Sequence, residues 1–201
     1  HYLWSVFHDV QGLINLMGGD KVFVAKLDSV FTVPNTFKVG TYNRVIHEMA
    51  EMEMINMGQY AHGNEPGHHT IYMYNRVGRP DKTQKYVNQV LTTLYDNTPA
   101  GICGNEDTGQ MSAWYVFSSL GFYPMNPASG QYELGAPLFR KAVIRLASGK
   151  KLVIRADNLS DENIYVDKVY LNGQLLDRTY ITFEEVQQGG ELRFEMKGDD
   201  L

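Results

Sequence analysis

The feature that most constrains the fold is a change in the spacing of apolar residues near residue 125. Before it, apolar residues recur three or four positions apart, and the segments are bounded by Asp, Gly and Pro, which is typical of helices. After it, short β-branched or alternating runs follow one another, and Asn172-Gly173 is typical of a tight hairpin turn. Because helices come first and strands afterwards, the sequence predicts an α+β chain rather than a doubly wound sheet.

The first part, residues 1–125, is predicted to be helical. We expect helical segments that begin after Asp9, at Asp20, at Tyr42, at Asn64, at Asp81 and at Asp107. The third of these is expected to run to Met57 and the last to Leu120, each closed by the glycine that follows.

The second part, residues 126–201, is predicted to be an antiparallel, β-sandwich-like segment. The strands are expected over residues 142–146, 151–155, 164–171 and 191–196.

Composition excludes several classes of protein. The chain has a formal net charge of −5 and no run of more than two basic residues, which argues against binding to nucleic acid or an anionic membrane surface. No apolar run approaches the roughly 20 residues of a membrane span. The single cysteine, Cys103, excludes an internal disulfide framework and a cysteine-rich metal site.

A glycine-bounded turn, Gly104 to Gly109, places two acids just before an aromatic helix. Asp107 has the N-cap position, with Gln110 at capping-box spacing, so its carboxylate is predicted to sit at a helix N-terminus, where negative charge is favoured. This is suitable geometry for a functional carboxylate. The alternative is that Asp107 only caps the helix while Glu106 is solvated.

Two further polar groups interrupt the helical part. His47 and Glu48 are adjacent near the middle of the predicted third helix, and their alternative role is a partly exposed helix face. The segment from His62 to His69 combines Asn64 and Glu65 with three histidines at a predicted helix start. It matches no zinc spacing, and its oxygen ligands suit calcium better. A capped helix with surface histidines is the alternative.

Aromatic residues are frequent in the helical part, and they could form platforms for sugar rings or simply be core. The residues concerned are Trp4, Tyr60, Trp114, Tyr115, Phe122 and Tyr123.

Several blocks of this sequence together resemble glycoside hydrolase family 92, whose members are calcium-dependent exo-α-mannosidases. These blocks are residues 1–4, 7–13, 16–19, 47–49, 58–66, 82–84 and 104–124. The resemblance implies an N-terminal β-sandwich coupled to an (α/α)6 barrel. This chain then corresponds to the last helices of that barrel, residues 1–125, and the C-terminal β segment, residues 126–201.

The resemblance also implies a mechanism. Inverting glycosidases use a general acid and a carboxylate base, and Asp107 resembles the base, with Glu106 orienting it or tuning its pKa. The family's general acid belongs to a stretch expected before His1, so we expect this 201-residue piece to be inactive alone. Asn64 and Glu65 are the implied calcium ligands, and His47, Glu48 and His62 the implied contacts to a mannose-containing glycan.

The resemblance further implies hydrolysis of terminal α-mannosides, with the α-1,2 type expected, in the degradation of N-glycans by a periplasmic or secreted enzyme. The alternatives are a non-catalytic carbohydrate-binding or scaffolding module and an (α/α)6 glycosidase that acts on α-glucosides. Without the N-terminal partner, we expect exposed apolar faces and self-association of the piece. The faces expected to be uncovered comprise Trp4, Phe7, Phe23, Val30 and residues 166–171.

Overall fold

The computed structural model describes residues 2–199, and His1, the first residue of the first family-like block, lies outside the described residues. The helices are η1 (Tyr2–Trp4), α1 (Val10–Met17), α2 (Asp20–Thr32), η2 (Gly40–Tyr42), α3 (His47–Ile55), η3 (Glu65–Gly67), η4 (Thr70–Val77), α4 (Pro80–Thr93), α5 (Gln110–Ser119), η5 (Pro127–Ser129) and α6 (Phe183–Gln188). The strands are β1 (Phe122–Tyr123), β2 (Gln131–Leu134), β3 (Lys141–Arg145), β4 (Lys151–Asp157), β5 (Tyr165–Leu171), β6 (Gln174–Leu175), β7 (Tyr180–Thr182) and β8 (Gly190–Lys197). The predicted α+β class is therefore confirmed.

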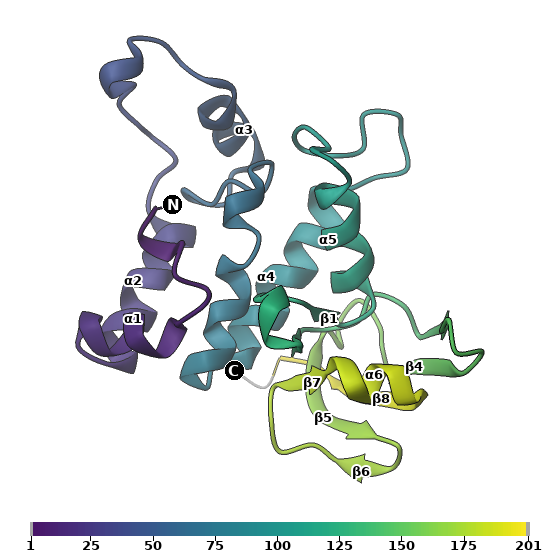
Figure 1. Cartoon of the computed structure of the whole chain (residues 1–201). Helices are drawn as coiled ribbons and strands as arrows, with labels where there is room; N and C mark the ends of the chain where they lie inside the picture. The colour runs from purple at the N-terminus through teal and green to yellow at the C-terminus, as the bar shows by residue number, and fades with distance from the viewer. Residues whose placement is uncertain (1, 200–201) are drawn as a thin grey trace.

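The helical and β parts lie beside each other, with α4 and α5 between the N-terminal helices and the sheets (Figure 1). Residues 33–46, with η2 at the far end, form an excursion that stands away from the remainder of the chain (Figure 1). None of the helices within residues 2–199 has the length and apolar character needed to cross a bilayer.

Several helix starts follow the predicted chemistry. Asp9 caps α1, because its Oδ1 accepts a hydrogen bond of 2.9 Å from the Gly12 amide. Helix α2 begins at Asp20 as predicted, and α4 begins at Pro80, one residue before the predicted start.

Two helix predictions need correction. The third helix begins at His47 rather than Tyr42, because Asn43 adopts a left-handed conformation with φ 54° and Ile46 is extended. His47 and Glu48 therefore lie in the first turn and not near the middle of a helix. The fourth predicted helix is two 3₁₀ helices, η3 and η4, and the Asn64 side chain makes no capping hydrogen bond.

The β part forms two sheets, with strand orders β1-β2-β7 and β3-β4-β8-β5-β6. The four predicted strands and the Asn172-Gly173 hairpin are present, with φ 52° and 82° at the turn. The prediction of a wholly antiparallel segment is wrong at one place, because β4 and β8 pair in parallel. The chain passes through β5 to α6 before β8 returns beside β4 in the same direction, and residue alternation alone does not encode that direction.

Two hydrophobic cores hold the chain together. The helical core contains Trp4, Phe23 and Tyr72, while the β core contains Phe194 and already includes Phe122 from β1. The cores therefore meet just before the predicted boundary at residue 125, and the side chain of Phe117 on α5 packs against both.

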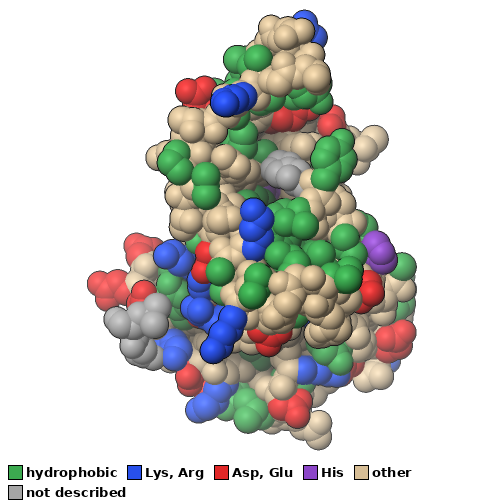
Figure 2. Space-filling model, turned by 90° about the vertical axis from the view of Figure 1, so that its left-hand side faces the viewer, with side chains coloured by type: hydrophobic (Ala, Val, Ile, Leu, Met, Phe, Trp, Pro, Cys, Tyr) green, Lys and Arg blue, Asp and Glu red, His purple; other side chains and the backbone are tan. Residues whose placement is uncertain are grey.

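The predicted exposure of apolar faces is wrong for two of the named residues. Trp4 is 4% exposed and Phe23 is 0% exposed, and their rings meet edge to face with centroids 5.5 Å apart. The isolated apolar residues that helices α1 and α2 do expose include Leu16 and Val22. Figure 2 shows apolar side chains dispersed among charged ones over this side of the molecule. These two aromatic rings thus give no reason to expect self-association.

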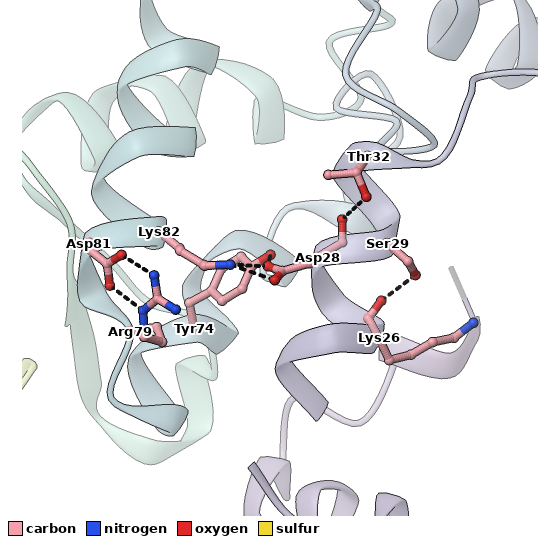
Figure 3. A network of polar contacts seen from close by, with 8 residues as sticks. All are labelled: Lys26, Asp28, Ser29, Thr32, Tyr74, Arg79, Asp81 and Lys82. Carbon is pink, nitrogen blue, oxygen red and sulfur yellow. Dashed lines mark hydrogen bonds and ion pairs between the residues drawn. The ribbon is translucent and has the colours of Figure 1, made fainter. Parts of the chain in front are cut away.

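A polar network joins α2 to η4 and α4 (Figure 3). Asp28 accepts hydrogen bonds from the Tyr74 hydroxyl at 2.8 Å and from the Lys82 ammonium, which lies 2.6 Å from both carboxylate oxygens. Burial and the neighbouring Asp28 raise the pKa of Tyr74, so its hydroxyl keeps the proton it donates. The network therefore fixes α2 against η4 and α4.

A buried ion pair joins the helical part to the β part. Glu133 on β2 is 1% exposed and pairs with Arg76 at the end of η4, while Asn75 donates a hydrogen bond of 3.1 Å to the same carboxylate. Burial raises the pKa of Glu133, and the Arg76 charge opposes that shift. The carboxylate is therefore tolerated inside the protein only while Arg76 accompanies it.

This pairing predicts an asymmetric response to mutation. Arg76→Met leaves Glu133 buried without its counter-ion, and we expect the free energy of unfolding to fall by about 3 kcal/mol. The double variant Arg76→Met with Glu133→Met removes both charges and should lose less than the single variant. Urea denaturation of both variants measures this, and a double variant less stable than Arg76→Met would contradict it.

Candidate active site

Two turns meet at the end of the molecule from which α3 and α5 begin (Figure 1). Their backbones touch at Gly63 and Gly104: a Cβ on Gly104 would lie 2.6 Å from the Gly63 Cα, which no side chain tolerates. A Cβ on Gly63 would likewise lie 2.8 Å from the Cys103 carbonyl oxygen. Glycine at both positions therefore allows the turn that carries Glu65 to lie against the turn that carries Asp107.

The Asp107 turn is strained. Asp107, Thr108 and Gly109 are all left-handed, with φ of 43°, 58° and 86°. Such a conformation costs a non-glycine residue on the order of 1 kcal/mol or more, and it persists only where surrounding contacts hold it. Here the amides of Gln110 and Met111 donate to the carbonyls of Asp107 and Glu106 at 3.2 and 3.4 Å.

The sequence predicted that Asp107 caps α5, but the cap is provided by Glu106. The Glu106 carboxylate accepts hydrogen bonds from the Ser112 amide at 3.0 Å and the Ser112 hydroxyl at 2.8 Å. The N-cap position belongs to Gly109, because the left-handed turn displaces Asp107 from the helix end. The structure thereby separates the two acids: Glu106 is bound to the helix, and Asp107 is exposed.

A cluster of carboxylates surrounds Asp107. Burial raises the pKa of Glu65, and the neighbouring carboxylate of Asp107 raises it further. Burial also raises the pKa of Glu51, as do the negative charges of Glu48, Glu65 and Asp107, while His47 opposes them.

Helix α3 contributes two of these carboxylates, Glu48 and Glu51, together with His47. The His47 Nε2 atom lies 3.3 Å from Glu48 Oε1, and the His47 side chain is 64% exposed. Glu48, Glu51 and Glu65 each have one carboxylate oxygen that is buried and has no hydrogen-bond partner. Buried oxygens of this kind normally find a donor or a cation, so this cluster has unused capacity to bind one.

Glu51 was not identified from the sequence. It lies one helical turn after His47 and Glu48, and this spacing of i and i+3 or i+4 was the available signal. Its Oε2 atom lies against Gly63, 2.5 Å from where a Cβ would be. The contact therefore depends on a glycine in a separate turn, and the sequence does not show that this turn lies beside α3.

His62, expected to contact sugar, is 0% exposed in this structure. The Tyr95 hydroxyl donates to the Met111 carbonyl at 3.1 Å, so it accepts from His62 Nε2 at 2.7 Å. His62 Nδ1 then accepts from the Tyr60 hydroxyl at 2.9 Å. Both ring nitrogens are used inside the protein, and His62 supports the two turns from behind.

The aromatic residues considered as sugar platforms are mostly core. Those exposed by less than a tenth of their surface are Trp4, Tyr60, Trp114, Phe122 and Tyr123. Tyr115 is half-buried and packs on Tyr95, with the two ring centroids 4.9 Å apart. The alternative that these rings form the core is confirmed for the buried five.

Oxygen donors are the groups available for a metal ion. The Asn64 amide and the unpartnered oxygens of Glu48 and Glu65 are hard ligands of the kind calcium prefers. Between residues 2 and 199, no three or more His, Cys, Asp and Glu side chains are arranged to hold a metal ion. The donor set therefore fits calcium in chemistry, with any further ligands to come from other groups.

A family model described as the glycosyl hydrolase family 92 catalytic domain matches residues 1–198. The chain belongs to this family. It is 50% identical to an inverting mannosidase of family 92 from Bacteroides thetaiotaomicron, whose solved structure superposes with a TM-score of 0.82 and of which it covers 27%. An α-mannosidase of family 92 from the same organism, solved also with mannoimidazole, is 40% identical with a TM-score of 0.84, and 24% of it is covered.

Both comparisons cover 98% of this family 92 chain. A secreted, uncharacterized glycosidase of Arthroderma benhamiae is 30% identical over 92% of the chain and 21% of its own length. The chain thus spans about a quarter of the solved relatives and about a fifth of the fungal one.

The buried histidines predict acid sensitivity. Burial lowers the pKa of His62, His69 and His68, that of His68 to about 4. Below about pH 6.5 the unfolded chain binds protons that the folded chain does not, so the free energy of unfolding should fall between pH 6.5 and 4, by roughly 3 kcal/mol for His68 alone.

The raised pKa values of Glu51 and Glu65 act in the opposite direction in this range, because they favour the folded state when protonated. A His68→Gln variant isolates the histidine contribution, since glutamine can make both hydrogen bonds of the ring without titrating. Urea denaturation from pH 7.5 to 4.5 should show a shallower loss in the variant, and equal slopes would contradict the assignment.

Proposed function

We propose that the protein containing this chain hydrolyses terminal α-mannosides of glycans with inversion, and that this chain supplies the base side of the active site. The observation that carries the proposal is the placement of Asp107, exposed on a strained turn and in contact with Glu65 across the Gly63 and Gly104 contact. Strain of this kind is concentrated at functional sites. Asp107 is the general base of this proposal.

In this mechanism Asp107 takes a proton from the water that attacks the anomeric carbon. Asp107 is not occupied with capping, because Glu106 holds the first turn of α5 through Ser112. A general acid protonates the leaving oxygen from the opposite side, at the separation of roughly 6.5–9.5 Å that leaves room for the water. We propose that this acid comes from a part of the protein other than this chain.

Asn64 and Glu65 are the proposed calcium ligands. This is supported by the Asn64 side chain, which makes no capping hydrogen bond, and by the unpartnered carboxylate oxygen of Glu65. Bound there, calcium would engage hydroxyls of the mannose and favour distortion of its ring. Exposed His47 and its partner Glu48 are the proposed sugar contacts on α3.

The proposed substrate is a mannose-containing glycan, with α-1,2 linkages and N-glycan degradation as the expected type and role. It is supported by the mannosidase relatives and by the mannoimidazole complex of one of them. The fungal relative is called secreted, which supports a secreted or periplasmic location. Residues 1–125 are proposed as the last helices of an (α/α)6 barrel, and the 201-residue chain alone is proposed to be inactive, since the general acid is proposed to come from another part of the protein.

Asp107→Asn in the complete enzyme should lower kcat by about 10² to 10⁴-fold, the usual contribution of general acid and base groups. Asparagine tolerates the left-handed conformation and should preserve the turn. Steady-state kinetics on an α-mannoside measures the change. Glu106→Gln is the matched control, because an amide oxygen can still accept from Ser112, and its loss in kcat should be far smaller. Equal losses in both variants would contradict the role of Asp107.

Asn64→Ala and Glu65→Ala should weaken calcium binding, because each removes a hard-oxygen ligand. Titration calorimetry of the complete enzyme measures the affinity, and a chelator should reproduce the loss of activity. Glu53→Ala, at an exposed position on α3, is the control and should bind calcium as the unmodified protein does. Unchanged affinity in both ligand variants would exclude these residues as ligands.

A further inference from the structure

We infer that Gln110 is a positioning residue, which sets the separation of Glu65 and Asp107 by bridging the two turns that carry them. This inference rests on the proposed function, because it concerns the geometry of the proposed base. It follows from the two hydrogen bonds of the Gln110 side-chain amide, whose partners are His68, between η3 and η4, and Tyr123 on β1.

The Gln110 side chain projects from the first residue of α5 toward two ring systems. Its Nε2 atom lies 3.2 Å from His68 Nδ1 and 3.1 Å from the Tyr123 hydroxyl. One amide nitrogen has two hydrogens, so it can donate to both partners at once. The side chain thereby links α5 to the segment between η3 and η4 and to β1.

The His68 ring is held in the one state that accepts this bond. Its Nε2 atom lies 2.8 Å from the His62 carbonyl oxygen, which can only accept, so Nε2 carries the hydrogen. In the neutral ring Nδ1 then has a free lone pair directed at Gln110. His68 is 1% exposed, and the Trp114 indole nitrogen donates to its carbonyl at 3.2 Å, so the ring has a fixed position.

The bridge runs between the residues that close the two turns. The His68 amide donates to the Glu65 carbonyl at 3.0 Å, and the Gln110 amide donates to the Asp107 carbonyl at 3.2 Å. A displacement of His68 relative to Gln110 is therefore passed to both carboxylate-bearing residues through one backbone hydrogen bond each. The glycine contact brings the two turns together, and the Gln110 bridge determines how they are offset.

Loss of the bridge should affect the chemical step more than binding. Without it, the Gln110 amide still donates to the Asp107 carbonyl, but Gln110 itself is no longer held to His68 and Tyr123, so the left-handed turn at Asp107 is held less firmly. A misplacement of about 1 Å in a catalytic group can cost on the order of 10²-fold in rate. We therefore expect Gln110→Met, which keeps the side-chain volume and removes the amide, to lower kcat by about 10- to 100-fold while KM changes little.

The matched control is Gln84→Met. Gln84 is 7% exposed and also joins two elements, since its Oε1 atom accepts from the Val166 amide of β5 at 3.0 Å. This bond connects α4 with the larger sheet and involves neither turn. Gln84→Met thus removes the same amide group as Gln110→Met, but at a site where we expect only the stability of the protein to change. Its kcat is expected within about threefold of that of the unmodified enzyme.

The experiment compares both variants in the complete enzyme by steady-state kinetics on an α-mannoside and by hydrogen exchange of the backbone amides in residues 104–111 and in β5. In Gln110→Met we expect faster exchange of the amides in residues 104–111, unchanged exchange at β5, and the loss in kcat. Tyr123→Phe, which removes only one of the two acceptors, should have an intermediate effect.

The inference is overturned if Gln110→Met loses no more kcat than Gln84→Met, or if exchange in residues 104–111 is the same in both. Should Gln110→Met fail to fold, Tyr123→Phe carries the same comparison. An unmodified enzyme that is inactive on all α-mannosides would instead refute the proposed function, and the exchange data would still decide whether Gln110 holds the turn.

Discussion

The candidate site depends on one close approach of two backbones, at Gly63 and Gly104. It brings together two turns that lie some forty positions apart in the sequence, and with them the contact between Glu65 and Asp107. Everything around it stabilises an arrangement that is unfavourable by itself: left-handed residues on one side and partly buried carboxylates on the other. A methyl group at either glycine would separate the turns, which gives a physical reason for a glycine beside each acidic block.

The surroundings of this contact are rigid because neutral histidines fill the space behind it. His62 and His68 stack with ring centroids 4.6 Å apart, and every ring nitrogen of the pair has a hydrogen-bond partner. Their lowered pKa values follow from burial and keep the rings uncharged. An imidazolium at either position would reverse the direction of at least one hydrogen bond. The network thus provides a firm base for acidic groups that face outward.

Much of the fold was predictable from local signals, such as Asp9 before α1, the Asn172-Gly173 hairpin and the β-branched strands. The sequence also singled out the two turns, through acids beside glycines. It could not show that Asp107 leaves the helix end, because a left-handed turn and a capping box begin with similar residues. The parallel pairing of β4 with β8, and the contact of Glu51 with Gly63, depend on long-range geometry that no local pattern encodes. Helix α6 had a readable signal, the capping box of Thr182 and Glu185, that went unused.

The Arg76 and Glu133 pair has a consequence for any attempt to divide the protein. The change in sequence pattern near residue 125 invites a cut there, yet it would leave Arg76 and Asn75 of η4 without the β2 carboxylate and carbonyl that they bind. The severed β piece would meanwhile lose β1, and with it the edge on which β2 pairs. The change from helices to strands therefore does not mark a domain boundary in this molecule. The helices that carry the acidic turns are expected to be expressed successfully only together with the sheets.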